Sequence, residues 1–273
     1  MSPMAAERIT VAGLAATPVK GLRIGLRSSL RLERGHIAGD RLFYLVDDRG
    51  RLVNGKLAAG LQALTADYDE RVRVLTIGFP AGERVEAPVE LGAKLQTRFY
   101  SDEREARLVN GPFAQAISEH LGFALRLVAP ADSGAAPDRG AAGAVSMISG
   151  ASLALLARVA GEGTVDARRF RMSMELAGAA AHEEDEWVGM QLSVGEARIA
   201  IEGHVGRCIV TTRNPESGEV DLPTLDLIGS YRRAVDSTEP LPLGIYGEVL
   251  EPGTISVGDP VMVVTWPETH SSC

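Results

Sequence analysis

The sequence predicts a β-rich α+β protein with a few short helices. Much of the chain consists of runs of about five to eight residues rich in Val, Ile, Leu and Thr, which Gly, Pro and Asp separate, as is typical of short strands joined by turns. Helical periodicity is scarce. With 273 residues, 45% of them hydrophobic, the chain is long enough to bury a core as one large domain or two smaller ones.

The strand predictions follow the apolar runs. We expect strands at residues 41–46, 71–77, 94–100, 124–128, 197–202 and 207–212. Turn residues at 47–50 and 194–196 predict two hairpins.

Three segments carry a helical pattern. In residues 113–121 the apolar side chains share one stripe, with Asn110 or Gly111 as cap and Gly122 as stop. Residues 152–159 and 223–232 are the other two, and Pro223 suits a first helical turn.

A tract rich in Gly, Ala, Pro and Asp at residues 129–143 is typical of a connector. We therefore expect a domain at residues 1–128 with one helix near 112–122, a second domain at 144–267, and a flexible tail at 268–273.

Charge and composition exclude several function classes. The 36 acidic and 28 basic residues give a net charge of -8, which repels nucleic acid. The apolar stretch at residues 11–16 is far shorter than the roughly 18 residues of a membrane helix and lacks the layout of a secretory signal, so we expect a cytoplasmic protein that does not enter a membrane. Two cysteines supply neither a disulfide framework nor an iron–sulfur cluster. Any electrons must therefore come from elsewhere.

Familiar catalytic motifs are absent from the sequence. The glycine-rich loops of dinucleotide- and nucleotide-binding proteins do not occur, nor do the G-x-S-x-G and H-E-x-x-H motifs of hydrolases.

Cys208 is the first candidate for chemistry. A lone cysteine in an apolar run is usually a small buried hydrophobe, but Arg207 and Arg213 on either side favour a thiolate. His204 on an unbroken strand would stand roughly 13 Å away, too far to share a metal ion. The acidic tract at residues 182–186 has the ligands for a hard cation, although such a tract is more often a solvated loop.

Three cations stand beside Gly or Pro near predicted strand ends, namely Lys20, Arg41 and Arg171. Each alone is most often a surface charge. Together in an acidic protein they predict a clamp for phosphate, of the kind that also holds pyridoxal phosphate, because the guanidinium fork matches phosphate oxygens.

Several segments, in order and over nearly the whole chain, resemble the MOSC proteins with an N-terminal β-barrel domain, the group that includes the mitochondrial amidoxime-reducing component. The strongest match is GRCIVTTRNPESG at residues 206–218, followed by LDLIGSYR at 225–232, LGIY at 243–246 and EPGTISVGDPV at 251–261. Upstream, PVKG at 18–21, GDR at 39–41, SGASL at 149–153 and FR at 170–171 also match.

The resemblance implies two β-barrel-like domains and a molybdenum cofactor. In this interpretation Cys208 ligates the metal, and Lys20, Arg41 and Arg171 hold the cofactor's phosphate. The other predicted cofactor contacts are Ser173, Arg207 and Tyr246. The implied reaction is a two-electron reduction of an N-oxygenated small molecule, with electrons from a separate redox partner.

The chain departs from the family pattern in its polar residues. Small polar residues are replaced by Ala141-Ala142-Gly143, an expected Asn by Ser173, and a Ser by Gly206, while Gly21 stands where a hydroxyl often follows the lysine. These changes leave two alternatives open. One is a sulfur carrier with a persulfide on Cys208, and the other is a MOSC-fold binding protein without catalysis.

Overall fold

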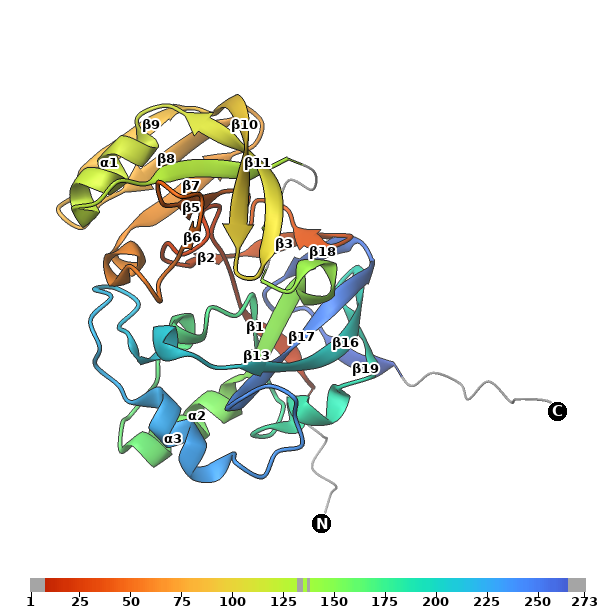
Figure 1. The fold of residues 1–273 in the computed structure, drawn as a ribbon. Coiled ribbons are helices and arrows are strands. Elements are labelled where there is room, and N and C mark those ends of the chain that lie inside the picture. Colours follow the sequence, from red (N-terminus) through yellow and green to blue (C-terminus); the bar gives the residue numbers. More distant parts are fainter. Residues whose placement is uncertain (1–7, 132–134, 137, 265–273) are drawn as a thin grey trace, which may run out of the picture.

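Strands dominate the computed structural model, which describes residues 8–131, 135–136 and 138–264 (Figure 1). This confirms the predicted β-rich α+β class. The predicted tail at 268–273 and part of the predicted connector lie outside the described residues.

The largest sheet has eight strands and forms the lower half of the molecule in Figure 1. Its order is β19 (Val261–Val264), β15 (Gln191–Val194), β16 (Ala197–Gly206), β17 (Pro242–Glu251), β13 (Val145–Ser149), β14 (Met174–Ala177), β1 (Thr10–Ala16) and β2 (Gly25–Arg27). Only the β13–β14 pair is parallel, and helix α2 (Gly150–Ala160) makes the crossover between these two strands, as parallel pairing requires.

The upper half holds two further sheets. One has the order β10 (Glu90–Phe99), β11 (Asp102–Asn110), β12 (Arg126–Pro130), β5 (Tyr44–Val46) and β6 (Leu52–Val53). The other is β7 (Thr65–Asp69), β8 (Val74–Gly78) and β9 (Arg84–Pro88). Among the described residues the strand pairings do not close any sheet into a barrel, which corrects that detail of the prediction.

The helices are short. The α-helices are α1 (Phe113–Leu121), α2 and α3 (Thr224–Tyr231), and the 3-10 helices are η1 (Ala59–Ala63), η2 (Gly140–Gly143), η3 (Ala167–Phe170), η4 (Glu183–Trp187) and η5 (Ile209–Thr212). Gly122 ends α1 in the left-handed conformation, as predicted, but Pro112 rather than Asn110 or Gly111 precedes its first turn. In the described residues no helix is long and apolar enough to span a membrane.

The first strands of the chain belong physically to the C-terminal sheet. β1 pairs with β14, and β3 (Ser29–Glu33) pairs with β18 (Gly253–Ser256) and β4 (His36–Ile37) in a small separate sheet. Accordingly Val11, Leu14 and Leu32 pack in the same core cluster as residues of β13 to β17. The strand pairing therefore crosses the predicted boundary near residue 129, and the chain passes from the lower half to the upper half and back (Figure 1).

Candidate functional site

A cavity of about 490 Å³ gathers most of the predicted site residues. Its lining includes the predicted Lys20, Arg41, Arg171, Arg207, Cys208 and Tyr246, and also Asn54, Tyr100, Asp138, Arg139 and Ser146, which the sequence did not point to. These residues come from both halves of the molecule. The volume falls within the roughly 300–1,000 Å³ of small-molecule sites.

Cys208 lies where β16 ends and η5 begins, and it is half-buried. Its carbonyl oxygen accepts two hydrogen bonds from Thr211, one from the backbone N–H and one from the hydroxyl, both 3.0 Å long. The backbone that carries the thiol is therefore held from the following turn.

The strand predicted at residues 207–212 is wrong, because residues 209–212 form the 3-10 helix η5. A run of β-branched residues favours a strand. Here, however, the hydroxyl of Thr212 donates to the carbonyl of Ile209 at 2.7 Å, as that of Thr211 does to Cys208. Such local bonds compete with sheet pairing. The Thr211 hydroxyl also meets that of Thr224 at 2.7 Å, which ties η5 to the start of α3.

Arg207 is buried beside the thiol with all of its bonds directed to neutral groups. Its guanidinium donates to the carbonyls of Leu243 and Phe170 and, at 3.1 Å, to the sulfur of Met172. Burial lowers its pKa to about 9, although the charge of Cys208 opposes this shift. Arg207 thus joins β17 and η3 around the cavity and sets a positive charge next to the cysteine.

Lys20 is only 4% exposed, and a carboxylate meets its ammonium group. The Nζ donates to Asp138 Oδ1 at 2.5 Å and to the carbonyl of Ala136 at 3.2 Å. The hydroxyl of Tyr100 donates to the same Asp138 oxygen at 2.7 Å. Burial lowers the pKa of Lys20 to about 8; Asp138 raises it in part, and Arg41 lowers it further.

Arg41 and Arg171 both have left-handed backbone conformations, with φ of 50° and 54°. Asp40 pairs with Arg41 at 2.9 Å, and the guanidinium of Arg171 donates to the carbonyl of Leu22 at 2.7 Å. Tyr100, with φ of 59°, also lines the cavity, so three of the six described non-glycine residues with positive φ lie there. Strained backbone of this kind gathers at functional sites, where the surroundings hold it.

Positive charge exceeds negative charge at this site. Arg171 forms no ion pair among the described residues. Burial, the larger cause, and repulsion from Arg41 together lower its pKa to about 10. A depressed pKa on a buried cation shows that the protein alone does not compensate the charge. The cavity wall is therefore suited to an anion.

Tyr246 and Ser173 have different positions. Tyr246 lines the cavity and its ring lies 4.7 Å from the guanidinium carbon of Arg139. Ser173 is 2% exposed and does not line the cavity; its hydroxyl accepts from the N–H of Ser146 and donates to that residue's carbonyl. Ser146 itself is a lining residue. Ser173 thus holds Ser146 in place from behind.

The segment that contains Glu239 and Pro240 approaches Gly206 closely. A Cβ there would lie 2.4 Å from a carboxylate oxygen of Glu239 and 3.1 Å from the carbonyl of Pro240. Glu239 in turn pairs with Arg139 at 2.9 Å. The segment around Glu239 therefore packs directly on Gly206 and forms part of the cavity rim.

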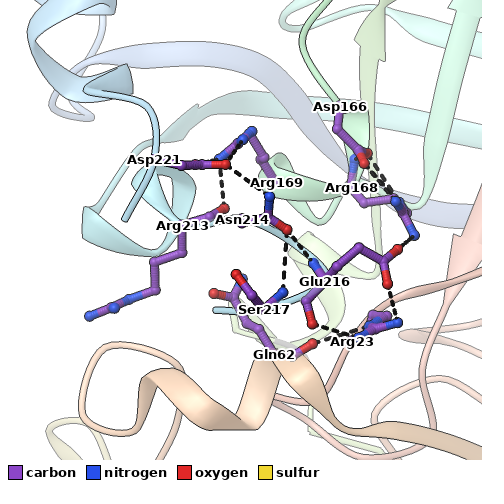
Figure 2. A network of polar contacts seen from close by, with 10 residues as sticks. All are labelled: Arg23, Gln62, Asp166, Arg168, Arg169, Arg213, Asn214, Glu216, Ser217 and Asp221. Carbon is purple, nitrogen blue, oxygen red and sulfur yellow. Dashed lines mark hydrogen bonds and ion pairs between the residues drawn. The ribbon is translucent and has the colours of Figure 1, made fainter. Parts of the chain in front are cut away.

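A second group of arginines holds the loop that follows η5 (Figure 2). The carboxylate of Glu216 pairs with Arg23 from the first part of the chain and, at 2.6 Å, with Arg168. Arg169 binds both carboxylate oxygens of Asp221, at 2.6 and 2.7 Å. This loop is thus fastened to Arg23, next to β2, and to η3 and its flank on the C-terminal side of Cys208.

His204 and the acidic tract lie outside the cavity lining. Asp185 approaches His204 at 3.6 Å and pairs with Arg232. The expectation of a solvated loop at 182–186 is wrong for Glu184, which is fully buried in η4 and accepts a hydrogen bond from the Ser152 hydroxyl. Among the described residues no group of His, Cys, Asp and Glu has the arrangement of a metal site.

The cavity's donor set fits the implied cofactor. A soft thiolate is a ligand for a heavy transition metal, and guanidinium and ammonium groups bind phosphate. Cys208 and the cations Lys20, Arg41 and Arg171 meet in a single cavity large enough for a small cofactor. A single thiol beside three cations, of which Arg171 has no ion pair among the described residues, suits a metal cofactor that carries a phosphate group.

The comparisons with known proteins point to the same family. The MOSC domain model matches residues 136–262. Mitochondrial amidoxime reducing component 2 of Bos taurus is 28% identical over 260 residues, which are 86% of this chain and 75% of that protein. The human component 2 is 38% identical over 98 residues, 34% of this chain and 29% of its own length. The solved YuaD protein of Bacillus subtilis has a TM-score of 0.44 and 13% identity, covering 95% of this chain and 97% of its own. The residues that the MOSC domain model matches include Cys208, Arg171, Arg207 and Tyr246.

Proposed function

We propose that this chain binds the molybdenum cofactor in the cavity and reduces an N-oxygenated small molecule by two electrons. The observation that carries the proposal is the meeting of Cys208 with Lys20, Arg41 and Arg171 around one space. The likeness to the amidoxime-reducing components supports the reaction class.

Each residue has a role that follows from its position. Cys208 ligates the metal, and Thr211 holds the backbone beneath it. Lys20, Arg41 and Arg171 bind the phosphate and so orient the cofactor. When bound, the metal supplies an acceptor for the substrate's oxygen atom and a store for two electrons.

The overall reaction consumes two electrons and two protons: an N–O bond breaks, an N–H bond forms and water leaves. The electrons come from a separate redox protein, because two cysteines cannot hold an iron–sulfur cluster in this chain. The net charge of -8 favours a basic partner. We place the protein in the cytoplasm, which cell fractionation would test.

Metal analysis of protein from cofactor-competent cells tests the proposal. We expect about one molybdenum per chain, and its loss in Cys208→Ser. Cys273→Ser changes the other cysteine and is the matched control, which should keep the metal. A low molybdenum content that Cys208→Ser leaves unchanged would contradict the proposal. Reduction of an amidoxime with an artificial electron donor then tests the reaction class.

A persulfide carrier is the alternative that the sequence left open. Such a protein needs an accessible thiol but has no use for the surplus cations of the cavity, so the charge of the site favours the cofactor. Intact mass measurement decides between them, because a persulfide adds about 32 Da to Cys208.

A further inference from the structure

Asp138 occupies a position in the cavity that a bound anion would use. Its Oδ1 accepts hydrogen bonds from both the Lys20 ammonium at 2.5 Å and the Tyr100 hydroxyl at 2.7 Å. A cation and a hydroxyl that converge on one oxygen are the donors that a phosphate oxygen takes. The amide of Asn54 also reaches the Tyr100 hydroxyl, at 3.3 Å. The Oδ1 of Asp138 therefore occupies a position in which a phosphate oxygen would accept the same two hydrogen bonds.

The carboxylate is ionised whenever the cations are. Burial alone would raise the pKa of Asp138, but Lys20 and Arg41 hold it well below its usual range. Arg171 lies in the same cavity without a carboxylate partner among the described residues. An anion that enters the cavity thus finds Lys20 already paired with Asp138 and Arg171 without an ion pair among the described residues.

Asp138 is also placed so that it can leave. Its side chain is 47% exposed, whereas that of Lys20 is 5% exposed, so the carboxylate is already partly hydrated. Water can replace the bonds it gives up, while the buried ammonium of Lys20 needs a new anion.

We propose that Asp138 is an internal competitor for the anion site, and that a phosphate monoester binds at Lys20 and Tyr100 by displacing its carboxylate. This inference rests on the phosphate subsite of the proposed function. The displacement lowers the affinity for any anion by the free energy of the Asp138 contacts. A ligand with further contacts, such as a cofactor bound through Cys208, has binding energy that offsets the loss of the Asp138 contacts. Free phosphate lacks these further contacts and therefore binds weakly. Asp138 is therefore a residue that determines specificity.

Titration of inorganic phosphate into the full-length, cofactor-free protein at constant ionic strength tests the inference, with binding measured by calorimetry. We expect Asp138→Asn, which keeps the size and removes the charge, to bind phosphate about tenfold more tightly than the wild type. Asp138→Ala should behave in the same way, and melting curves check that both variants are folded. The matched control is Asp67→Asn, which removes one carboxylate, paired with Arg27, outside the cavity lining and should leave the affinity unchanged.

Lys20→Gln separates the two possible failures. If it weakens phosphate binding while Asp138→Asn and Asp138→Ala bind like the wild type, the anion site stands and the competitor role is wrong. If Lys20→Gln binds phosphate as well as the wild type, or if no variant binds it, the phosphate subsite itself is wrong and the inference falls with it. Phosphate binding that only the Asp138 variants show would support the inference.

Discussion

The cavity wall and the loop network of Figure 2 share Arg169, but two other cavity arginines, Arg171 and Arg207, have no carboxylate partner among the described residues, whereas the network arginines do. In the network, Arg23, Arg168 and Arg169 face carboxylates, and hydrogen bonding to Asp166 raises the pKa of Arg168. In the cavity, burial lowers the pKa values of Arg171 and Arg207. Compensated cations hold the fold together. Uncompensated cations cost stability and are consistent with a site that receives its counter-charge from a ligand.

The largest effect should come from removing a cation of the network. Arg169 is buried and binds both oxygens of Asp221 and the carbonyl of Arg213. Arg169→Gln should lower the free energy of unfolding by about 2–3 kcal/mol, because it leaves a carboxylate and a carbonyl without their charged donor. Urea denaturation measures this, with the exposed Arg49→Gln as control. A loss no larger than that of the control would break the distinction between the two regions.

Arg171 and Arg168 sharpen the comparison as a matched pair. Arg171→Gln should weaken phosphate binding about tenfold and lower the melting temperature only slightly, because this cation loses one hydrogen bond, to the Leu22 carbonyl, and no ion pair in the described residues. Arg168→Gln should do the reverse: it should cost about 1 kcal/mol of stability and keep the phosphate affinity. The opposite pattern would show that Arg171 is structural.

The pH dependence of the two properties should have opposite signs. The pKa of Lys20 falls from 10.5 to about 8 in the folded protein, so between these values the unfolded chain holds more protons and stability rises with pH. The affinity for an anion should fall as the pH rises through the same range, because binding needs the protonated ammonium group of Lys20. Sulfate titrations between about pH 6 and 9 measure this, since the charge of sulfate stays constant. Lys20→Gln should remove the contribution of this lysine to both slopes, leaving the smaller rise in stability that Arg171 and Arg207 supply at higher pH. A flat affinity profile in the wild type would exclude Lys20 from the site.

Local patterns predicted the fold better than they predicted the site. Gly122 and Pro223 marked the helix ends correctly, and the hairpin turns joined β5 to β6 and β15 to β16, because these signals act within a few residues. Pairing of β1 with β14 is a contact between distant segments, and no local pattern encodes it. The error at residues 209–212 arose because threonine hydroxyls, which the β-branched pattern ignores, bonded to the backbone.

The same division holds at the cavity. Lys20, Arg41 and Arg171 stood beside turn residues and matched family segments, so the sequence pointed to them. Asp138 and Tyr100 carried no such signal: one lies in a tract typical of a connector, and the other lies in the turn that follows β10. Both reach the cavity only because the upper half of the molecule folds over the C-terminal sheet.

The smallest effect concerns the rim, where the cavity meets the rest of the fold. Gly206→Ser, which restores the family's residue, should cost about 1 kcal/mol of stability, because its Cβ meets the Glu239 carboxylate and the Pro240 carbonyl. In a Glu239→Ala background the cost should shrink but not vanish, since the carboxylate is removed and the Pro240 backbone carbonyl stays. A double-mutant cycle on thermal unfolding measures the coupling. Zero coupling would mean that the Glu239 side chain moves aside without cost. The contact with Glu239 would then not be the reason for a glycine at position 206.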